Sequence, residues 1–174
     1  TGIHTLSLHD ALPISGLPAG YLNMVLGPGA VAGDALARDN RIAFYSFTGS
    51  SEVGMKLKTT VGLRPISLEL GSNSPTIVHS DADLNKAVEA CTRFAFANAG
   101  QVCISVQRVY VHRPVYDEFC KRAVSITGTL KVGDPLDPAN DLGCMISEYE
   151  AERTMEWINE AVTGGAKVLI GGRR

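Results

Sequence analysis

Short apolar runs and amphipathic stretches alternate along the chain from Gly16 onward. Apolar residues at three- and four-residue spacing predict helices, whereas short apolar runs ended by Gly or Pro predict strands. On this basis the first half is expected to contain strands at 21–26, 41–47 and 66–70 and helices at 31–38 and about 52–61. Strands that alternate with helices in this way are typical of a parallel α/β sheet.

The alternation continues after a break at Gly71–Pro75, which marks a hinge or a domain boundary. Ser80–Asp83 and Ser147–Glu150 each read as a capping box, in which a side chain at a helix start accepts a backbone N–H. Pro114 suits the first turn of a helix. The second half is therefore expected to contain strands at 76–79, 108–112 and 167–170 and helices at about 83–97, from 114 onward and from about 148 to 162.

Residues 1–15 differ in character from the rest of the chain. They follow no helical or strand period, and the stretch SLHDALPIS resembles a translated sequencing adapter. We expect residues 1–15 to be non-native or irregular and leave them out of the fold prediction. Since the chain begins with Thr and ends in GGRR, we also expect it to be a fragment of a longer protein.

Composition narrows the class of protein. Apolar residues make up 45% and charged residues 20% of the 174 residues, and the net charge is −2. These values are typical of a globular domain and argue against a disordered tail or a nucleic-acid surface. No apolar run approaches the roughly 20 residues of a membrane span. The cysteines and histidines lack metal-site spacing, so we expect no metal and a reduced, cytoplasmic protein.

Cys103 is the strongest candidate for a nucleophile. It follows a predicted helix in a loop, and the nearby Gly100 removes side-chain bulk beside the thiol. A nucleophile needs such exposure, together with backbone N–H groups that stabilise an oxyanion. By position alone, however, a single cysteine is more often a small buried apolar residue. Cys91 and Cys120 lie on apolar helix faces and are expected in the core, and Cys144 shows no functional pattern.

Glu69 is a carboxylate near the carboxyl end of the apolar strand predicted at 66–70. Ligands of open α/β sheets gather beyond the carboxyl ends of strands. A partly buried Glu there would have a raised pKa, which suits a general base near neutral pH. A salt bridge from Glu69 to a Lys or Arg is an equally good interpretation.

The turn from Thr48 to Gly54 joins a predicted strand to a predicted helix. Backbone N–H groups at a helix start can bind phosphate, and Gly49 would allow close approach. The turn is neither a Walker A sequence nor GxGxxG, and Gly27, Gly29 and Gly33 miss the dinucleotide-binding spacing by one residue. Taken separately, an ordinary capped helix explains each of these features.

Four sequence blocks form a far more specific pattern together than apart: SFTGSSEVG at 46–54, LELGSNSP at 68–75, FANAGQVCIS at 96–105 and KVGDPLDP at 131–138. With these blocks, the chain from about Gly16 to Arg174 resembles an internal third of the aldehyde dehydrogenase superfamily. The resemblance implies a parallel-sheet, Rossmann-like part of an NAD(P)-binding domain over 16–70. It also implies the first part of an α/β catalytic domain, with the nucleophilic Cys, over 71–174.

The resemblance implies oxidation of an aldehyde to a carboxylic acid. Cys103 matches the family's nucleophile, whose thiolate adds to the aldehyde to form a thiohemiacetal, after which hydride passes to NAD or NADP. Glu69 matches the base that activates water to hydrolyse the resulting thioester. The specific aldehyde and the choice between NAD and NADP stay open.

The resemblance also implies a set of cofactor-binding residues. Ser50 would approach the pyrophosphate and Val53 the adenine end. Gly29 and Gly33 match the glycines beside the adenosine, and Leu70 and Gly71 match the stretch near the nicotinamide. The full set is Gly29, Gly33, Phe47, Thr48, Gly49, Ser50, Val53, Leu70 and Gly71.

Some features depart from the family pattern. Ser72 stands where the family usually has a second Gly after the base, and Cys144 stands where a Pro is usual. An oxyanion Asn and a ribose-binding Lys would lie upstream of this chain, and a further cofactor-binding Glu and the oligomerisation strand downstream. We therefore expect the 174-residue chain to be inactive alone and its parent enzyme to be a homo-oligomer, a dimer or a tetramer.

Three alternatives remain on sequence alone. A related enzyme could pass the acyl group to coenzyme A, although Glu69 favours hydrolysis. A non-catalytic protein could keep the scaffold, although the presence of both Cys103 and Glu69 argues against it. A cofactor-free thiol hydrolase would need a His, such as His79 or His112, close to Cys103 in space.

Overall fold

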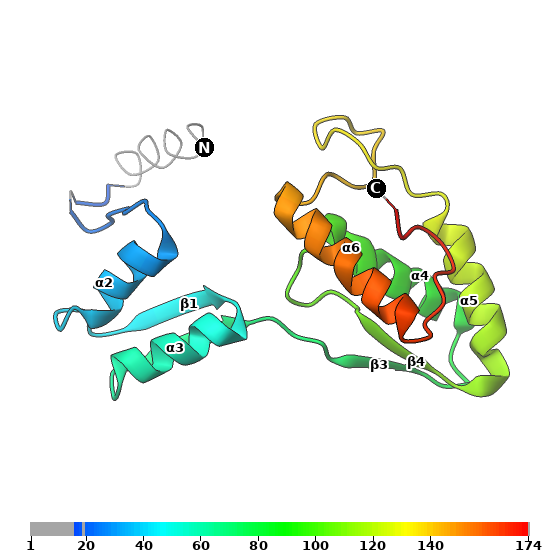
Figure 1. The fold of residues 1–174 in the computed structure, drawn as a ribbon, viewed down its shortest axis with the longest axis horizontal. Coiled ribbons are helices and arrows are strands. Elements are labelled where there is room, and N and C mark those ends of the chain that lie inside the picture. Colours follow the sequence, from blue (N-terminus) through cyan, green and yellow to red (C-terminus); the bar gives the residue numbers. More distant parts are fainter. Residues whose placement is uncertain (1–15, 19, 174) are drawn as a thin grey trace. The chain divides into compact units, whose positions relative to one another are not determined.

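The computed structural model describes residues 16–18 and 20–173. The expectation for residues 1–15 lies outside these residues. The chain divides between Glu69 and Leu70 into two compact units, each described here by itself (Figure 1). The assignment of 16–70 to a cofactor domain and of 71–174 to a catalytic domain stays a prediction.

The first unit consists of two short sheet strands and the helices beside them. Its elements are the π-helix η1 (Gly29–Gly33), α2 (Asp34–Arg38), β1 (Tyr45–Gly49), α3 (Ser51–Val61) and β2 (Ile66–Leu70). β1 and β2 pair in a two-stranded sheet. Ser50 caps α3, because its side chain accepts a hydrogen bond from the Val53 N–H at 3.3 Å. Ala37, Gly54 and Val61 are the buried residues of these helices.

Arg64 connects the end of α2 to β1. Its guanidinium donates to the backbone oxygens of Ala37 (2.7 Å) and Asp39 (2.6 Å) and to Tyr45 Oη (2.6 Å). It also lies over the Tyr45 ring, 5.0 Å from the ring centroid. Carbonyls at a helix end lack intrahelical partners, and Arg64 and the Tyr45 hydroxyl together supply hydrogen bonds to those of Ala37 and Asp39. These contacts fix the end of α2 beside β1.

Two predictions for the first unit are wrong. Residues 21–26 form no strand, and the strand expected at 41–47 runs instead from Tyr45 to Gly49. A strand needs a partner for its backbone groups, and among the described residues none pairs with 21–26, where Tyr21 and Leu26 are each 77% exposed. The helix expected at 31–38 begins earlier, at Gly29, with a π-helical turn.

The second unit packs helices on a parallel strand pair (Figure 1). Its elements are β3 (Pro75–Val78), α4 (Leu84–Phe96), the 3₁₀ turn η2 (Ala97–Gly100), β4 (Arg108–Val111), α5 (Arg113–Thr127) and α6 (Glu148–Thr163). β3 and β4 run parallel, with Pro75 opposite Arg108 and Val78 opposite Val111. Helices alternate with strands, two of them parallel, which confirms the expected α/β class.

The core of the second unit lies where α4 and α5 meet the sheet. Val78 from β3, Val88 and Cys91 from α4, and Phe119 from α5 are its buried members. Burial raises the pKa of the Cys91 thiol, as expected for an apolar structural cysteine. The core prediction for Cys91 is confirmed, whereas Cys120 is only half-buried.

Helix starts in the second unit agree with the sequence in part. Ser147 caps α6 by accepting from the Glu150 N–H, as predicted. The cap of α4 is Asp83, whose carboxylate accepts from the N–H groups of Asn85 (3.1 Å) and Lys86 (3.2 Å), so the prediction of Ser80 in that role is wrong. The predicted strand at 167–170 is also absent from the described residues. None of the described helices has the length and apolar character needed to cross a membrane.

Candidate cofactor pocket and thiol loop

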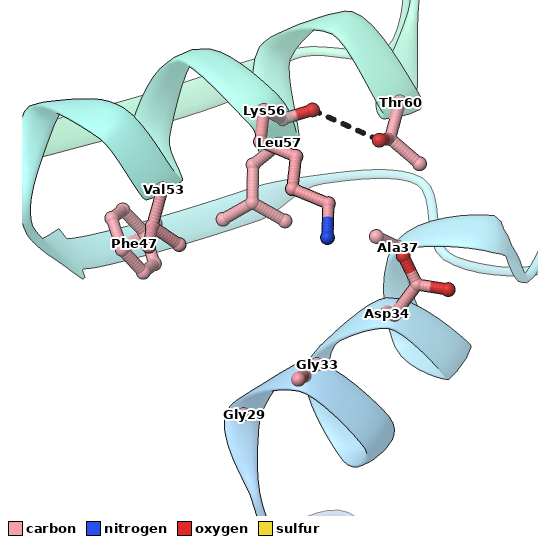
Figure 2. Close-up of a pocket in the computed structure, with 10 residues that line it drawn as sticks. Gly29, Gly33, Asp34, Ala37, Phe47, Val53, Lys56, Leu57 and Thr60 are labelled. Carbon is pink, nitrogen blue, oxygen red and sulfur yellow. Dashed lines mark hydrogen bonds between the residues drawn. The ribbon is translucent and has the colours of Figure 1, made fainter.

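A pocket of about 320 Å³ opens in the first unit between α3 and the η1–α2 segment (Figure 2). Four residues predicted to bind the cofactor line it: Gly29 and Gly33 from η1, Phe47 from β1 and Val53 from α3. The remaining lining residues are Ala30, Asp34, Ala37, Lys56, Leu57 and Thr60.

The glycines of the first unit have different steric roles. A Cβ added at Gly29 or Gly33 would meet no atom within 4 Å, so neither glycine is needed to avoid a clash within the chain. The missing side chains instead leave space in the pocket for a ligand. A Cβ at Gly49 would instead fall on the ring of Phe47. Gly49 therefore allows the Phe47 ring to lie back along the strand, a packing role that the sequence did not reveal.

Thr48 and Gly49 end β1 and Ser50 caps α3, and all three are exposed. The Ser50 side chain satisfies one N–H of the first helical turn, and the other N–H groups of a first turn have no partner within their helix. Such a helix start can bind an anion. Of the remaining predicted cofactor residues, Leu70 ends β2 and is half-buried, and Gly71 follows it and is exposed; both lie just beyond Glu69, where the chain divides.

The Cys103 thiol is exposed on the loop between η2 and β4. The backbone before it is left-handed at three successive residues, with φ of 51° at Asn98, 55° at Ala99 and 75° at Gly100. Left-handed backbone costs roughly 1–2 kcal/mol for most L-residues, with Gly exempt and Asn more tolerant, so surrounding contacts must enforce this turn. Asn98 and Gln101 supply some of them, since each side-chain amide donates to the other's backbone oxygen at 3.3 Å.

Two further contacts hold the thiol loop. The buried Ser105 donates its hydroxyl to the Ala95 oxygen at 3.1 Å, which ties the loop back to the end of α4. Gln101 Oε1 accepts from the Ile146 N–H at 2.8 Å, across 45 residues of sequence. The positioning role of Gln101 gave no signal in the sequence, because it depends on a contact distant along the chain.

Glu69 lies on the exposed face of β2. Side chains alternate along a strand, and Ser67 and Glu69 are exposed while Ile66, Leu68 and Leu70 are half-buried. The expectation that Glu69 is partly buried is therefore wrong in this chain. Glu69 also forms no ion pair with any Lys or Arg among the described residues, so nothing described supports a salt-bridge role.

His79 and His112 directly follow the carboxyl ends of β3 and β4. Their rings stack with centroids 4.7 Å apart, and His79 Nδ1 is 2.8 Å from Asp81 Oδ1, a contact that lowers the pKa of the Asp81 carboxyl. The Cys103 loop leads into β4 at its amino end, Arg108. Since β3 and β4 are parallel, the histidines and the loop adjoin opposite ends of the sheet, which argues against a Cys–His hydrolase. Within 16–18 and 20–173, no group of three or more His, Cys, Asp or Glu could hold a metal.

Comparison with known proteins identifies the family. Residues 1–174 match the aldehyde dehydrogenase family. The chain belongs to this family. The resemblance inferred from the four sequence blocks is thereby confirmed.

Curated aldehyde dehydrogenases align with almost the whole chain. It is 47% identical over 174 residues to a 3-sulfolactaldehyde dehydrogenase of Priestia aryabhattai, covering 100% of this chain and 36% of that protein. It is 41% identical over 170 residues to a lactaldehyde dehydrogenase of Methanococcus aeolicus, covering 98% of this chain and 37% of that protein. The chain thus spans about a third of the length of these aldehyde dehydrogenases.

Solved aldehyde dehydrogenase structures share the fold. A glyceraldehyde-3-phosphate dehydrogenase from Methanocaldococcus jannaschii, complexed with NADP, matches with a TM-score of 0.91 and 41% identity over 95% of this chain and 36% of that one. A betaine aldehyde dehydrogenase from Staphylococcus aureus, in complex with NAD+, matches with a TM-score of 0.92 and 28% identity over 98% of this chain and 34% of that one. The expected fold class is confirmed, and the roles of single residues stay predictions.

Proposed function

We propose that this chain is part of an enzyme that oxidises an aldehyde to a carboxylic acid, with NAD or NADP as the hydride acceptor. The observation that carries the proposal is the pocket on which Gly29, Gly33, Phe47 and Val53 converge, in a chain of this family. Cofactor sites are mostly apolar clefts of roughly 300–1,000 Å³, and a pocket of about 320 Å³ suits the adenosine half of a dinucleotide. Two curated relatives are named for 3-sulfolactaldehyde and lactaldehyde, so a short 2-hydroxyaldehyde is the first substrate to test.

The residues of the first unit would hold the cofactor by shape and by backbone dipoles. The adenosine half would lie against the backbone of Gly29 and Gly33, where no side chain takes up space. The apolar side chains of Phe47 and Val53 would contact it as well. The N–H groups and the positive dipole end of α3, beside Ser50, would attract the diphosphate. When bound, the nicotinamide accepts the hydride.

Cys103 would act as the nucleophile, and its exposure on a restrained loop supports this role. Its thiolate adds to the aldehyde carbon, forming a C–S bond while the carbonyl pair moves to oxygen. Hydride departs from the same carbon as the alkoxide regenerates C=O, which leaves a thioester. Glu69 then takes a proton from water, the hydroxide oxygen bonds to the thioester carbon, and the C–S bond breaks to release the acid and the Cys103 thiolate.

Product analysis tests this reaction on the intact enzyme to which the chain would belong. With lactaldehyde and NAD or NADP, we expect cofactor reduction and free acid in the absence of coenzyme A. Formation of acyl-coenzyme A without free acid would show that the enzyme transfers the acyl group and does not hydrolyse the thioester. Absence of cofactor reduction with every aldehyde tested would favour a non-catalytic scaffold. Cys103→Ala should lower kcat/KM by roughly a thousandfold or more, whereas Cys144→Ala, which removes the other exposed thiol, should not.

We further propose that the intact enzyme is a cytoplasmic homo-oligomer, a dimer or a tetramer, that binds neither nucleic acid nor membranes. The four free cysteines support a reducing compartment. Sedimentation velocity of the intact enzyme gives the oligomeric state, and a monomer would contradict it. Cell fractionation tests the location.

A further inference from the structure

The pocket of the first unit contains one cation among its lining residues, Lys56. Figure 2 shows the Lys56 side chain extending from α3 toward α2, with its Nζ in the space between the two helices. The other lining side chains are apolar except Thr60 and Asp34, and the Thr60 hydroxyl donates to the Lys56 backbone oxygen at 2.9 Å. Lys56 is exposed, so its charge is available to an anionic ligand in this pocket unless a carboxylate of the chain already pairs with it.

Asp34 faces the same pocket but is paired with Arg38. Arg38 Nε lies 2.6 Å from one Asp34 oxygen and Nη2 lies 3.3 Å from the other, a two-pronged ion pair. This contact holds the pKa of the Asp34 carboxyl below its usual range, with a smaller contribution from Lys56. Within the described chain no carboxylate lies within 4.0 Å of Lys56 Nζ. The charges of Asp34 and Arg38 neutralise each other, so the positive charge of Lys56 is the one that remains among the described residues at the pocket.

The position of Lys56 along α3 indicates which part of a dinucleotide this charge would meet. α3 begins at Ser51, and Lys56 is five residues later, about 7–8 Å along the axis at roughly 1.5 Å per residue. The diphosphate is proposed to bind at the helix start, so Lys56 serves a different group. The other site that can bear a phosphate in these cofactors is the 2′-oxygen of the adenosine ribose.

We propose that Lys56 binds the adenosine 2′-phosphate and so makes this enzyme favour NADP over NAD. The inference rests on the proposed function, since it assumes that the pocket holds the adenosine half of the cofactor. It assigns the choice between NADP and NAD to Lys56 on α3, a residue that no sequence pattern had pointed to.

Titration calorimetry of the intact enzyme tests the role of Lys56. Lys56→Met keeps most of the side-chain volume and removes the charge, and it should lower the ratio of NADP affinity to NAD affinity roughly tenfold, as expected for one lost charge-assisted contact. Lys56→Arg should keep most of that ratio. Lys58→Met, an exposed lysine on the same helix that does not line the pocket, is the matched control and should leave the ratio unchanged.

The outcomes separate this inference from the proposed function. If Lys56→Met binds both cofactors with an unchanged affinity ratio, or weakens both equally, the 2′-phosphate role is wrong and the proposed function stands. Binding of 2′,5′-ADP compared with 5′-ADP gives the same distinction without the nicotinamide half. If the unsubstituted enzyme binds neither cofactor, both the inference and the proposed function fail.

Discussion

At the scale of the residue, the thiol loop shows how backbone conformation can set the presentation of one side chain. Ala99 is left-handed between Asn98 and Gly100, which tolerate that conformation far better than Ala does. The turn forms because Ser105 and Gln101 hold the following residues, rather than because Ala99 favours it. The exposed thiol of Cys103 therefore depends on local strain that contacts on both sides sustain.

Gly100→Ala should destabilise the second unit by about 1–2 kcal/mol. Its φ is +75°, and the added Cβ would lie 3.3 Å from the Ala95 oxygen. Urea unfolding of the intact enzyme, followed by circular dichroism, measures the change. Gly164→Ala is the control, since its φ is −75° and its nearest contact is an ordinary 3.4 Å, and it should change stability by no more than about 0.5 kcal/mol. Equal effects of the two substitutions would contradict the strain assigned to this turn.

Glu69→Gln should separate the two halves of the proposed reaction in the intact enzyme. Without the base, the thioester on Cys103 forms but hydrolyses slowly, so a burst of reduced cofactor is expected, followed by a steady rate lowered roughly 100-fold or more. Stopped-flow absorbance at the nicotinamide band measures both phases. Glu89→Gln, an exposed carboxylate on α4, should leave both phases unchanged. Loss of the burst itself would contradict the assignment of Glu69 to hydrolysis.

The sequence predicted part of the site at this scale. Cys103 is in an exposed loop as expected, and Gly29, Gly33, Phe47 and Val53 line one pocket. The place of Lys56 in that pocket was not predictable, because Lys56 is exposed on α3 and becomes a pocket residue only where the η1–α2 segment lies opposite it.

At the scale of the element, local patterns located most helices well. α3, α4 and α6 agree with their predicted ranges within one or two residues, because apolar spacing and caps lie within the segments themselves. Strands were less predictable. The apolar runs at 21–26 and 167–170 form no strand in the described structure, because a strand depends on a neighbour that a local pattern cannot supply.

The capping of α4 gives a test at the scale of the element. Asp83→Ala removes hydrogen bonds to two N–H groups of the first turn and should lower the free energy of unfolding by about 1 kcal/mol. Ser80→Ala is the matched control, since Ser80 does not cap the helix, and it should have little effect. The measurement is urea unfolding of both variants of the intact enzyme beside the unsubstituted enzyme. If Ser80→Ala lowered the free energy of unfolding more than Asp83→Ala does, Ser80 would be the cap, as the sequence predicted.

At the scale of the whole molecule, each unit leaves large apolar side chains in solvent. Ile77 and Tyr110 are paired across β3 and β4 and are 77% and 57% exposed, and Trp157 on α6 is 58% exposed. Two-stranded sheets need further cover for stability, and contiguous apolar surface is normally buried against other segments. This exposure agrees with a chain that spans about a third of its relatives' length.

The 174-residue chain on its own should therefore bind a hydrophobic dye, self-associate and catalyse no cofactor reduction. Fluorescence of 8-anilinonaphthalene sulfonate and sedimentation velocity measure the first two properties, with the intact enzyme as the control that should bind little dye. A monomeric chain that binds no dye and unfolds cooperatively would contradict this expectation, and turnover by the chain alone would show that its own residues suffice for the reaction.

The left-handed run at 98–100 also has a consequence for protein engineering. The position of the Cys103 thiol depends on several successive backbone torsions, so it cannot be moved to another scaffold by a single substitution. Grafting it requires the stretch from Ala95 to Ser105 as one block, together with a backbone N–H placed as that of Ile146 is. A library that randomises the stretch would need to restrict residues 98 and 100 to glycine or asparagine, or most of its members would lose the turn before any chemistry could be screened.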